Sequence, residues 1–310
     1  MDENRPDFGK VVTRRRLSRW YWRLPLKWLV FLATLFVVLF PNPWQFARHV
    51  SHLSDLDGMV DPDAPQLAEW EAELWAMDRD GTADSGGSTA ESGSMAPRAM
   101  QSRVQTLVLD KVQYGWDWDV WGSADYMPTV QEMFEKAGSE DGILREDCDG
   151  RAVMAASLMR RLGYESQIVT DLRHVWVVTP HGEWMGPGLK KTLVSGASGN
   201  RFDLRTAVRN IPVSLSYGIA VFPVWREILI LAVGFVLVWN RRAAWKTAAL
   251  AGLFCLLGLY FMRLGVFEAR GESMPDVKWA PWVGILLTVL GFGIVWIASA
   301  RARRRTARIA

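Results

Sequence analysis

One thiol and one histidine have the types and spacing that a cysteine nucleophile needs. Cys148 lies in the run Asp147–Val153 (DCDGRAV), where a segment with helical periodicity begins, and His174 opens an apolar run 26 residues later. A thiol in the first turn of a helix lies at the positive end of the helix macrodipole, which lowers its pKa. Because Asp147 and Asp149 oppose this effect, a histidine is needed to hold the thiolate as an ion pair. The spacing equally allows a core cysteine and a core histidine that never meet.

The elements that must position these two residues form an α+β pattern. We expect the Cys148 helix to run to Leu162 and to stop at Gly163, with Cys148 on its core-facing side. Earlier helices are expected over 104–112 and over 128–134, the latter capped by Thr129. Strands are expected at 166–170 and 174–179, followed by a turn at His181-Gly182 into 183–185. Helices followed by antiparallel strands indicate an α+β domain.

Three groups of residues resemble the core of the transglutaminase-like superfamily. They are Trp121–Thr129 (WGSADYMPT), Asp147–Val153, and Leu162–Tyr164 (LGY) followed by His174–Val177 (HVWV). The likeness is to bacterial transglutaminase-like cysteine peptidases and covers roughly residues 100–188. It implies a papain-like α+β fold in which Cys148 is the nucleophile and His174 the general base. The implied reaction is hydrolysis of, or acyl transfer from, a peptide or amide through a thioester, without a cofactor.

This sequence departs from the family pattern at the third catalytic residue. Family members usually carry an aspartate on the strand after the histidine, shortly past a tryptophan. Here Trp184 is followed by MGPG, and the hairpin register puts Pro187 where the aspartate is expected. Asp171 and Asp203 are the candidate replacements. A cysteine–histidine pair can also work without a third residue, whose main task is to orient the imidazole.

Other groups of residues are weaker candidates for a functional site. His49 and His52, with Asp55 and Asp57 after them, could bind a metal, but a polar helix face is the commoner meaning. A zinc site of Cys148, His174 and His181 lacks the usual ligand clusters, so no metal residue is assigned. Two further sets are aromatic: Trp176 and Trp184, expected in the core, and Tyr114, Trp116 and Trp118, candidates for lining a cleft.

Four apolar stretches have the length or composition of membrane spans: 25–44, 221–239, 243–262 and 279–299. The second carries Arg226 and Glu227 near its start, which suits an interface or a partner helix. The first could be a cleaved secretion signal. It lacks a small-x-small cleavage site, and Trp44 with Phe46 suits an interface anchor, so we expect an uncleaved anchor.

Basic residues set the expected orientation. They cluster before the first span, at 241–246 and at 301–308, which places both termini in the cytoplasm and residues 41–220 outside. That external stretch has 26 acidic and 16 basic residues, a balance that argues against nucleic acid as a partner. The expected regions are a basic N-terminus (1–24), the first span (25–44), a helical membrane-proximal region (45–80), a flexible linker (81–99), the transglutaminase-like domain (100–215), three further spans (221–239, 243–262, 279–299) and a basic tail (300–310).

Two functions follow from this sequence. The first is a membrane-anchored cysteine hydrolase or acyltransferase of a bacterial inner membrane, multi-pass, with its catalytic domain in the periplasm. Its partners would be a peptide or protein substrate carrying an amide, the membrane lipids and a membrane protein. The second is a catalytically inactive domain of the same fold that serves as a binding or scaffolding module, which the missing aspartate near Pro187 favours.

Overall fold

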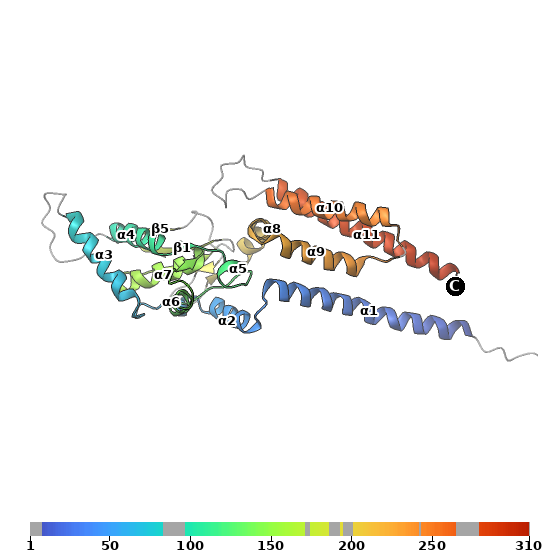
Figure 1. The fold of residues 1–310 in the computed structure, drawn as a ribbon, viewed down its shortest axis with the longest axis horizontal. Coiled ribbons are helices and arrows are strands. Elements are labelled where there is room, and N and C mark those ends of the chain that lie inside the picture. Colours follow the sequence, from blue (N-terminus) through green and yellow to red (C-terminus); the bar gives the residue numbers. More distant parts are fainter. Residues whose placement is uncertain are drawn as a thin grey trace, which may run out of the picture. The chain divides into compact units, whose positions relative to one another are not determined.

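The structure is a computed structural model of the whole chain. It describes residues 8–82, 97–170, 174–185, 193–194, 201–241, 243–264 and 279–309. The chain forms two compact units, one from Asn42–Gly218 and one from Met1–Pro41 with Ile219–Ala310 (Figure 1). The expected linker over 81–99 falls mostly on residues outside the described ranges.

The first unit is helix-rich and contains a small sheet. Its helices are α2 (Pro43–Ser54), η1 (Asp57–Met59), α3 (Leu67–Thr82), α4 (Pro97–Lys111), α5 (Asp117–Val120), α6 (Val130–Ser139), α7 (Cys148–Arg161) and the beginning of α8 (Leu204–Val221). Its strands are β1 (Gln113–Tyr114), β2 (Arg145–Glu146), β3 (Gln167–Thr170), β4 (Val175–Thr179), β5 (Gly182–Trp184), β6 (Leu193–Val194) and β7 (Arg201–Phe202). The expected α+β class is confirmed at this level.

Two separate strand pairings matter for the site. Strands β3 to β7 form an antiparallel sheet in the order β5-β4-β3-β6-β7, and Val177 lies opposite Trp184 in the β4–β5 hairpin. Strands β1 and β2 form a second, parallel pair in which Tyr114 lies opposite Glu146. The hairpin follows the sequence expectation, whereas the short parallel pair has no periodic signal in the sequence.

Helix α7 is the central element of this unit. It packs against α3, α4, α6 and the strands β3 and β4, and every residue from Ala152 to Met159 is buried. A helix that is buried all round is surrounded by other elements, so the core side is not limited to one face. At its end Gly163 adopts a positive φ of 83°, as expected for a C-terminal cap.

The core also includes the region before α4. Leu56, Leu67 and Leu74 are fully buried in the same cluster as Val153 and Met159. The main-chain N–H of Asp61 also donates to the buried Ser157 hydroxyl of α7 (3.1 Å). Residues 45–80, expected as a separate membrane-proximal region, therefore share a core with the domain expected from residue 100.

The second unit consists of long apolar helices. They are α1 (Phe8–Leu39), α9 (Val224–Val238), α10 (Trp245–Leu264) and α11 (Ala280–Ile309). In the described residues two helices, Trp245–Leu264 and Ala280–Arg305, are long and apolar enough to cross a membrane, in agreement with the expected spans at 243–262 and 279–299. The residues Arg23–Leu39 meet this criterion only together with Pro43–Ser54, and α9 has 15 residues.

One buried acidic residue in this second unit forms an ion pair. Glu227 of α9 is 6% exposed, and it accepts a hydrogen bond of 2.7 Å from Arg263 of α10. The same guanidinium donates to the carbonyl oxygens of Ile219 (2.8 Å) and Phe222 (2.9 Å). Glu227, which suggested a partner helix from sequence, therefore has its partner in α10.

Candidate functional site

The fold brings Cys148 to the strand that follows His174. Cys148 is the first residue of α7, and its thiol accepts a hydrogen bond from the main-chain N–H of Val175, the first residue of β4. His174 is the residue directly before Val175 and is half-buried. The nucleophile and base expected from the sequence therefore lie at the same end of the α7–β4 contact.

The electrostatic surroundings of the thiol differ from the sequence expectation. Burial raises the pKa of Cys148 well above its usual value, and the carboxylate of Asp147 raises it further. The hydrogen bond from Val175 works in the opposite direction, and Asp117 and Asp125 add to the increase. The expectation of a lowered pKa is wrong, because desolvation and nearby negative charges outweigh the helix macrodipole.

Carboxyl groups surround the first turn of α7. Asp147 is the N-cap and accepts from the N–H of Asp149 (3.1 Å), and Asp149 accepts from the N–H of Gly150 (2.6 Å). Asp117 is 3% exposed and accepts from the N–H of Tyr126 (2.8 Å), while its other oxygen, Oδ1, is buried without a partner. Burial raises the pKa of Asp117 and of Asp149 well above the usual range, with Asp147 the next cause for both.

Glu146 adds a fourth carboxyl group, itself buried, directly before the N-cap. It accepts from the indole N–H of Trp121 (3.0 Å), and its Oε2 is buried without a partner. Burial and the charge of Asp147 raise its pKa well above the usual range. A Cβ atom at Gly150 would lie 2.6 Å from that Oε2. The glycine of the DCDG run therefore makes the space that this carboxyl group occupies.

Three of the acidic residues have the arrangement of cation ligands. Asp117, Asp125 and Asp149 each offer one oxygen, and these oxygens lie within 4.8 Å of one another. Carboxylate oxygens are the ligands that Ca²⁺ and Mg²⁺ prefer. In the described part of the chain this group could hold a divalent cation. Sequence reasoning did not find it, because its members come from separate segments.

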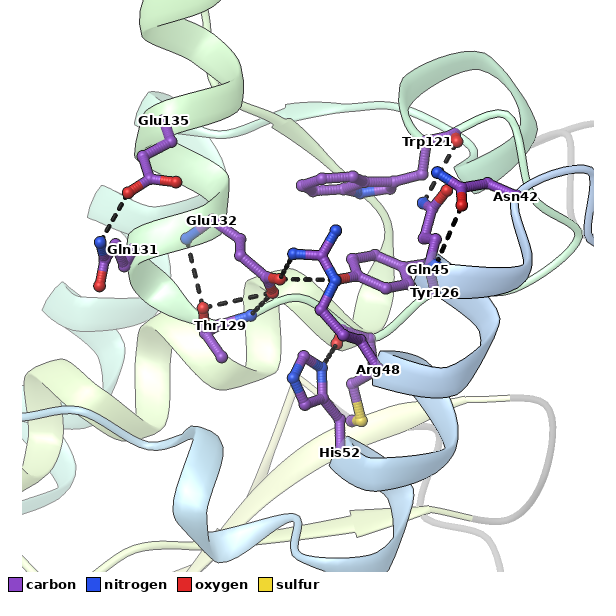
Figure 2. Close-up of polar contacts among 11 residues, drawn as sticks. Asn42, Gln45, Arg48, His52, Trp121, Tyr126, Thr129, Gln131, Glu132 and Glu135 are labelled. Carbon is purple, nitrogen blue, oxygen red and sulfur yellow. Dashed lines mark hydrogen bonds and ion pairs between the residues drawn. The ribbon is translucent and has the colours of Figure 1, made fainter.

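Helix α2 supports the segment that carries these acids. Gln45 donates to the carbonyl of Trp121 (3.2 Å), and the N–H of Met127 donates to Nδ1 of His49 (3.2 Å). His52 donates through Nδ1 to the carbonyl of Met127 (2.7 Å), and Figure 2 shows His52 on this helix. Burial lowers the pKa of His49, in accord with a neutral ring that accepts a hydrogen bond.

A second set of contacts ties the same segment to α6. Arg48 of α2 donates to Glu132 of α6 (2.9 Å), and the hydroxyl of Tyr126 donates to the same carboxylate oxygen (2.6 Å) (Figure 2). Thr129 caps α6 in a reciprocal capping box with Glu132, which confirms the cap expected at Thr129. Because the N–H of Tyr126 also donates to Asp117, these contacts position the acidic residues around the start of α7.

An aromatic group lies at the edge of the site. Trp116 and Trp118 are stacked with centroids 4.9 Å apart, and Tyr114 meets Trp116 edge-on at 4.9 Å. The guanidinium of Arg151 lies 5.1 Å from the centre of the Tyr114 ring. The β1–β2 register places Tyr114 opposite Glu146, two residues before Cys148. Tyr114 therefore lies near the start of α7, whereas Trp176 and Trp184 are buried in the core as expected.

The structure describes one of the two candidates for a third catalytic residue. Asp171 and Pro187 lie outside the described residues. Asp203 is exposed and caps α8, where it accepts from the N–H groups of Arg205 (3.0 Å) and Thr206 (3.3 Å) and from the Thr206 hydroxyl (2.6 Å). The hydrogen bonds from Thr206 lower the pKa of Asp203. This capping role explains Asp203 without a part in catalysis.

The candidate metal sets from the sequence have other partners. His49 and His52 both hydrogen-bond the main chain of Met127, while Asp57 pairs with Arg160. His181 lies at the far end of β4 from Cys148, and five strand residues span about 17 Å. That length separates His181 from the thiol.

No family model, curated protein or solved structure matches this chain. The functional argument therefore depends on the residues and geometry described above. Sequence reasoning found Cys148 and His174 but not Asp117, Asp125 or Glu146. Asp125 lies within the run Trp121–Thr129 that carries the family resemblance, and this was the one signal that could have led to it.

Proposed function

We propose that this protein is a membrane-anchored cysteine hydrolase or acyltransferase with a transglutaminase-like domain. The observation that carries the proposal is the contact between the Cys148 thiol, at the start of α7, and the N–H of Val175. That contact places the strand residue next to His174 at the thiol. The motif resemblance assigns nucleophile and base to these same two residues.

The reaction would proceed through a thioester. His174 takes the thiol proton while the sulfur of Cys148 attacks the carbonyl carbon of a peptide or amide, and the same proton then passes to the leaving amine as the C–N bond breaks. Water hydrolyses the thioester, or an amine accepts the acyl group. The N–H groups of Asp149 and Gly150 already donate to carboxylates, so the oxyanion donor at this helix start would be the N–H of Cys148.

The raised thiol pKa determines when the proton moves. A thiol surrounded by Asp147, Asp117 and Asp125 stays protonated at neutral pH in the absence of a counter-charge. Deprotonation by His174 must then accompany the attack, instead of preceding it as a stable thiolate–imidazolium pair. The aromatic rings of Tyr114, Trp116 and Trp118 would form one wall of the substrate site.

The second candidate function is a catalytically inactive module of a membrane complex. The same raised pKa favours it, because a thiol that stays protonated among carboxyl groups is a weak nucleophile. The absence of the usual aspartate at Pro187 points the same way. In this alternative the acidic cluster and the aromatic wall would bind a partner or a cation.

We also propose an inner-membrane protein with four spans, at 25–44, 221–239, 243–262 and 279–299, and with residues 41–220 in the periplasm. Large apolar side chains support spans in α1 and α9: Leu29 and Val37 of α1 are 65% and 60% exposed, and Val236 of α9 is 65% exposed. Reporter fusions at Gly86 and at the C-terminus should report opposite sides of the membrane. Fusions on the same side would contradict this topology.

The experiment for the catalytic proposal is covalent capture on the full-length protein. A panel of peptide and amide electrophiles is applied, and the acyl adduct is located by mass spectrometry. We expect acylation of Cys148 that disappears in Cys148→Ser and falls strongly in His174→Ala. Cys255 of α10 provides the matched control thiol, because Cys255→Ser should leave the result unchanged. Acylation of Cys148 that is unchanged in His174→Ala would favour the catalytically inactive module.

A further inference from the structure

Helix α2 buries polar side chains and exposes its large apolar ones. The side chains that face the domain are Gln45 and His49, which are 7% and 4% exposed, together with His52, which bonds to Met127. The large apolar side chains of the same helix remain exposed, at 48% for Val50 and 41% for Leu53. This is the reverse of the pattern that a helix in contact with water normally shows.

Helix α6 of the same unit shows the normal pattern. It buries Val130 and Met133 and exposes Gln131 and Glu135, and these two polar side chains bond to each other (Figure 2). Both helices are short, amphipathic and packed on the same domain. The reversal in α2 is therefore not shared by α6, a second short amphipathic helix of this unit.

The outward face of α2 is also uncharged. The helix carries one Lys, Arg, Asp or Glu residue, Arg48, and that residue pairs with Glu132 at 2.9 Å. Trp44, in the first turn, is 80% exposed, and tryptophan is enriched where proteins meet the bilayer interface. An apolar face without basic residues fits the boundary between headgroups and acyl chains, and it binds without requiring anionic lipid.

The chain itself brings α2 to that boundary. Helix α1 ends at Leu39 and α2 begins at Pro43. The three residues between them can extend by about 10 Å at most, so α2 must begin close to the point where α1 leaves the hydrocarbon. Asn42 caps α2 through the N–H groups of Trp44 and Gln45, which starts a new helix there.

We propose that α2 is an interfacial helix that lies in the membrane surface, with Trp44, Val50 and Leu53 in the headgroup–acyl boundary. Its inner face holds the segment from Trp121 to Met127, which carries Asp125 and Tyr126 next to the candidate site. The lipid surface is thereby a structural partner of this domain. The inference rests on the proposed span in α1 and does not depend on the catalytic proposal.

The test measures the environment of single probes on the full-length protein in phosphatidylcholine vesicles. In a Cys148→Ser, Cys255→Ser background, a fluorescent thiol probe is placed at Val50→Cys or at Leu53→Cys. Leu109→Cys of α4 is the matched control in water, because Leu109 is 45% exposed. Val37→Cys of α1 reports on the span. Quenching is measured with aqueous iodide and with lipids that carry a spin label at a shallow or a deep acyl position.

We expect the probes at 50 and 53 to lose iodide quenching relative to 109 and to be quenched most by the shallow label, with no change at high salt. Iodide quenching equal to that at 109 would overturn the proposal. Deep-label quenching would also overturn it and make α2 part of a broken span. Protection from iodide without quenching by either lipid label would mean that another copy of the chain covers the face. If position 37 is not quenched by lipid labels, the proposed span fails, and the failure is then distinct from that of α2.

Discussion

The two units of this protein bury acidic groups in opposite ways. In the helical unit Glu227 is paired with Arg263, and the guanidinium also satisfies two main-chain carbonyl groups. Around the start of α7, by contrast, the described carboxyl groups make no ion pair with lysine or arginine, although Glu227, like Asp117 and Glu146, has one buried oxygen without a hydrogen-bond partner. A paired buried charge maintains a structure, whereas unpaired buried acids reduce stability and are typical of functional sites.

Removing one partner of the paired acid should have the largest effect. Arg263→Met leaves the carboxylate of Glu227 buried and uncompensated, which we expect to lower the free energy of unfolding by about 3–5 kcal/mol. The double variant with Glu227→Gln should recover a large part of this loss. Denaturant unfolding of the protein in detergent provides the measurement. If Arg263→Met were as stable as the parent protein, the proposed difference between the two units would be contradicted.

The contacts that an added Cβ atom would make at two glycines provide a second comparison between the two units. At Gly258 of α10 a Cβ would lie 2.7 Å from the main-chain oxygen of Gly284 in α11, whereas at Gly150 it would meet the carboxyl end of Glu146. A backbone cannot move aside, but a side chain can. We expect Gly258→Ala to cost about 1–3 kcal/mol or more and Gly150→Ala to cost less. Thermal unfolding of both variants in one detergent tests the order, and the reverse order would contradict it.

Neutralising an unpaired acid should stabilise the protein. The pKa of Asp117 is raised in the folded state, so folding binds a proton, and stability falls as the pH rises from the unfolded pKa through the folded one. Asp117→Asn should therefore flatten this decline. The gain in the free energy of unfolding should increase as the pH rises, because the amide never ionises. The measurement is denaturant unfolding against pH.

Asp141 is the matched control for that prediction. Its exposed carboxylate pairs with Arg145 and accepts from the N–H of Ile143, and these hydrogen bonds lower its pKa to about 2. Its contribution to stability is present above the unfolded pKa and is lost as the pH falls toward 2. Asp141→Asn should therefore not stabilise the protein. Equal gains from both substitutions would show that burial at Asp117 is not the cause.

The smallest expected effect is a change in thiol titration. The carboxylate of Asp147 raises the pKa of Cys148, so Asp147→Asn should move the midpoint of Cys148 alkylation to lower pH. Mass spectrometry of the alkylated peptide over a pH series measures this midpoint in a Cys255→Ser background. The exposed Asp119→Asn is the control and should leave the midpoint in place. An unchanged or higher midpoint in Asp147→Asn would contradict the electrostatic description of the site.

Local signals in the sequence account for the elements of the fold. The strands expected over 166–170 and 174–179 are present as Gln167–Thr170 and Val175–Thr179, a turn before Gly182 joins β4 to β5, and Gly163 follows the end of α7. Each of these features is set by residues close in sequence, through alternation, turn chemistry or a cap. The length and apolar composition of α10 and α11, which are long and apolar enough to cross a membrane, can likewise be recognised in the sequence alone.

The acidic cluster could not be derived in this way. Asp117, Glu146 and Asp149 come together through the parallel β1–β2 pair, which has two residues on each strand and no periodicity. The sequence showed the helix macrodipole and the opposing Asp147 and Asp149 at Cys148, but not the burial of the thiol or the proximity of Asp117 and Asp125, which raise its pKa. The role of α2 was hidden for a similar reason, because its partners Trp121 and Met127 are more than 70 residues away.

The central claim is that His174 deprotonates Cys148 during attack, within surroundings that keep the thiol protonated at rest. The most direct test is the rate of Cys148 acylation by the p-nitrophenyl ester of an acetylated amino acid, measured against pH and compared with simple alkylation. We expect acylation to proceed well below the alkylation midpoint, and this low-pH acylation to be lost in His174→Ala. Acylation that follows the alkylation midpoint in both proteins would contradict the account.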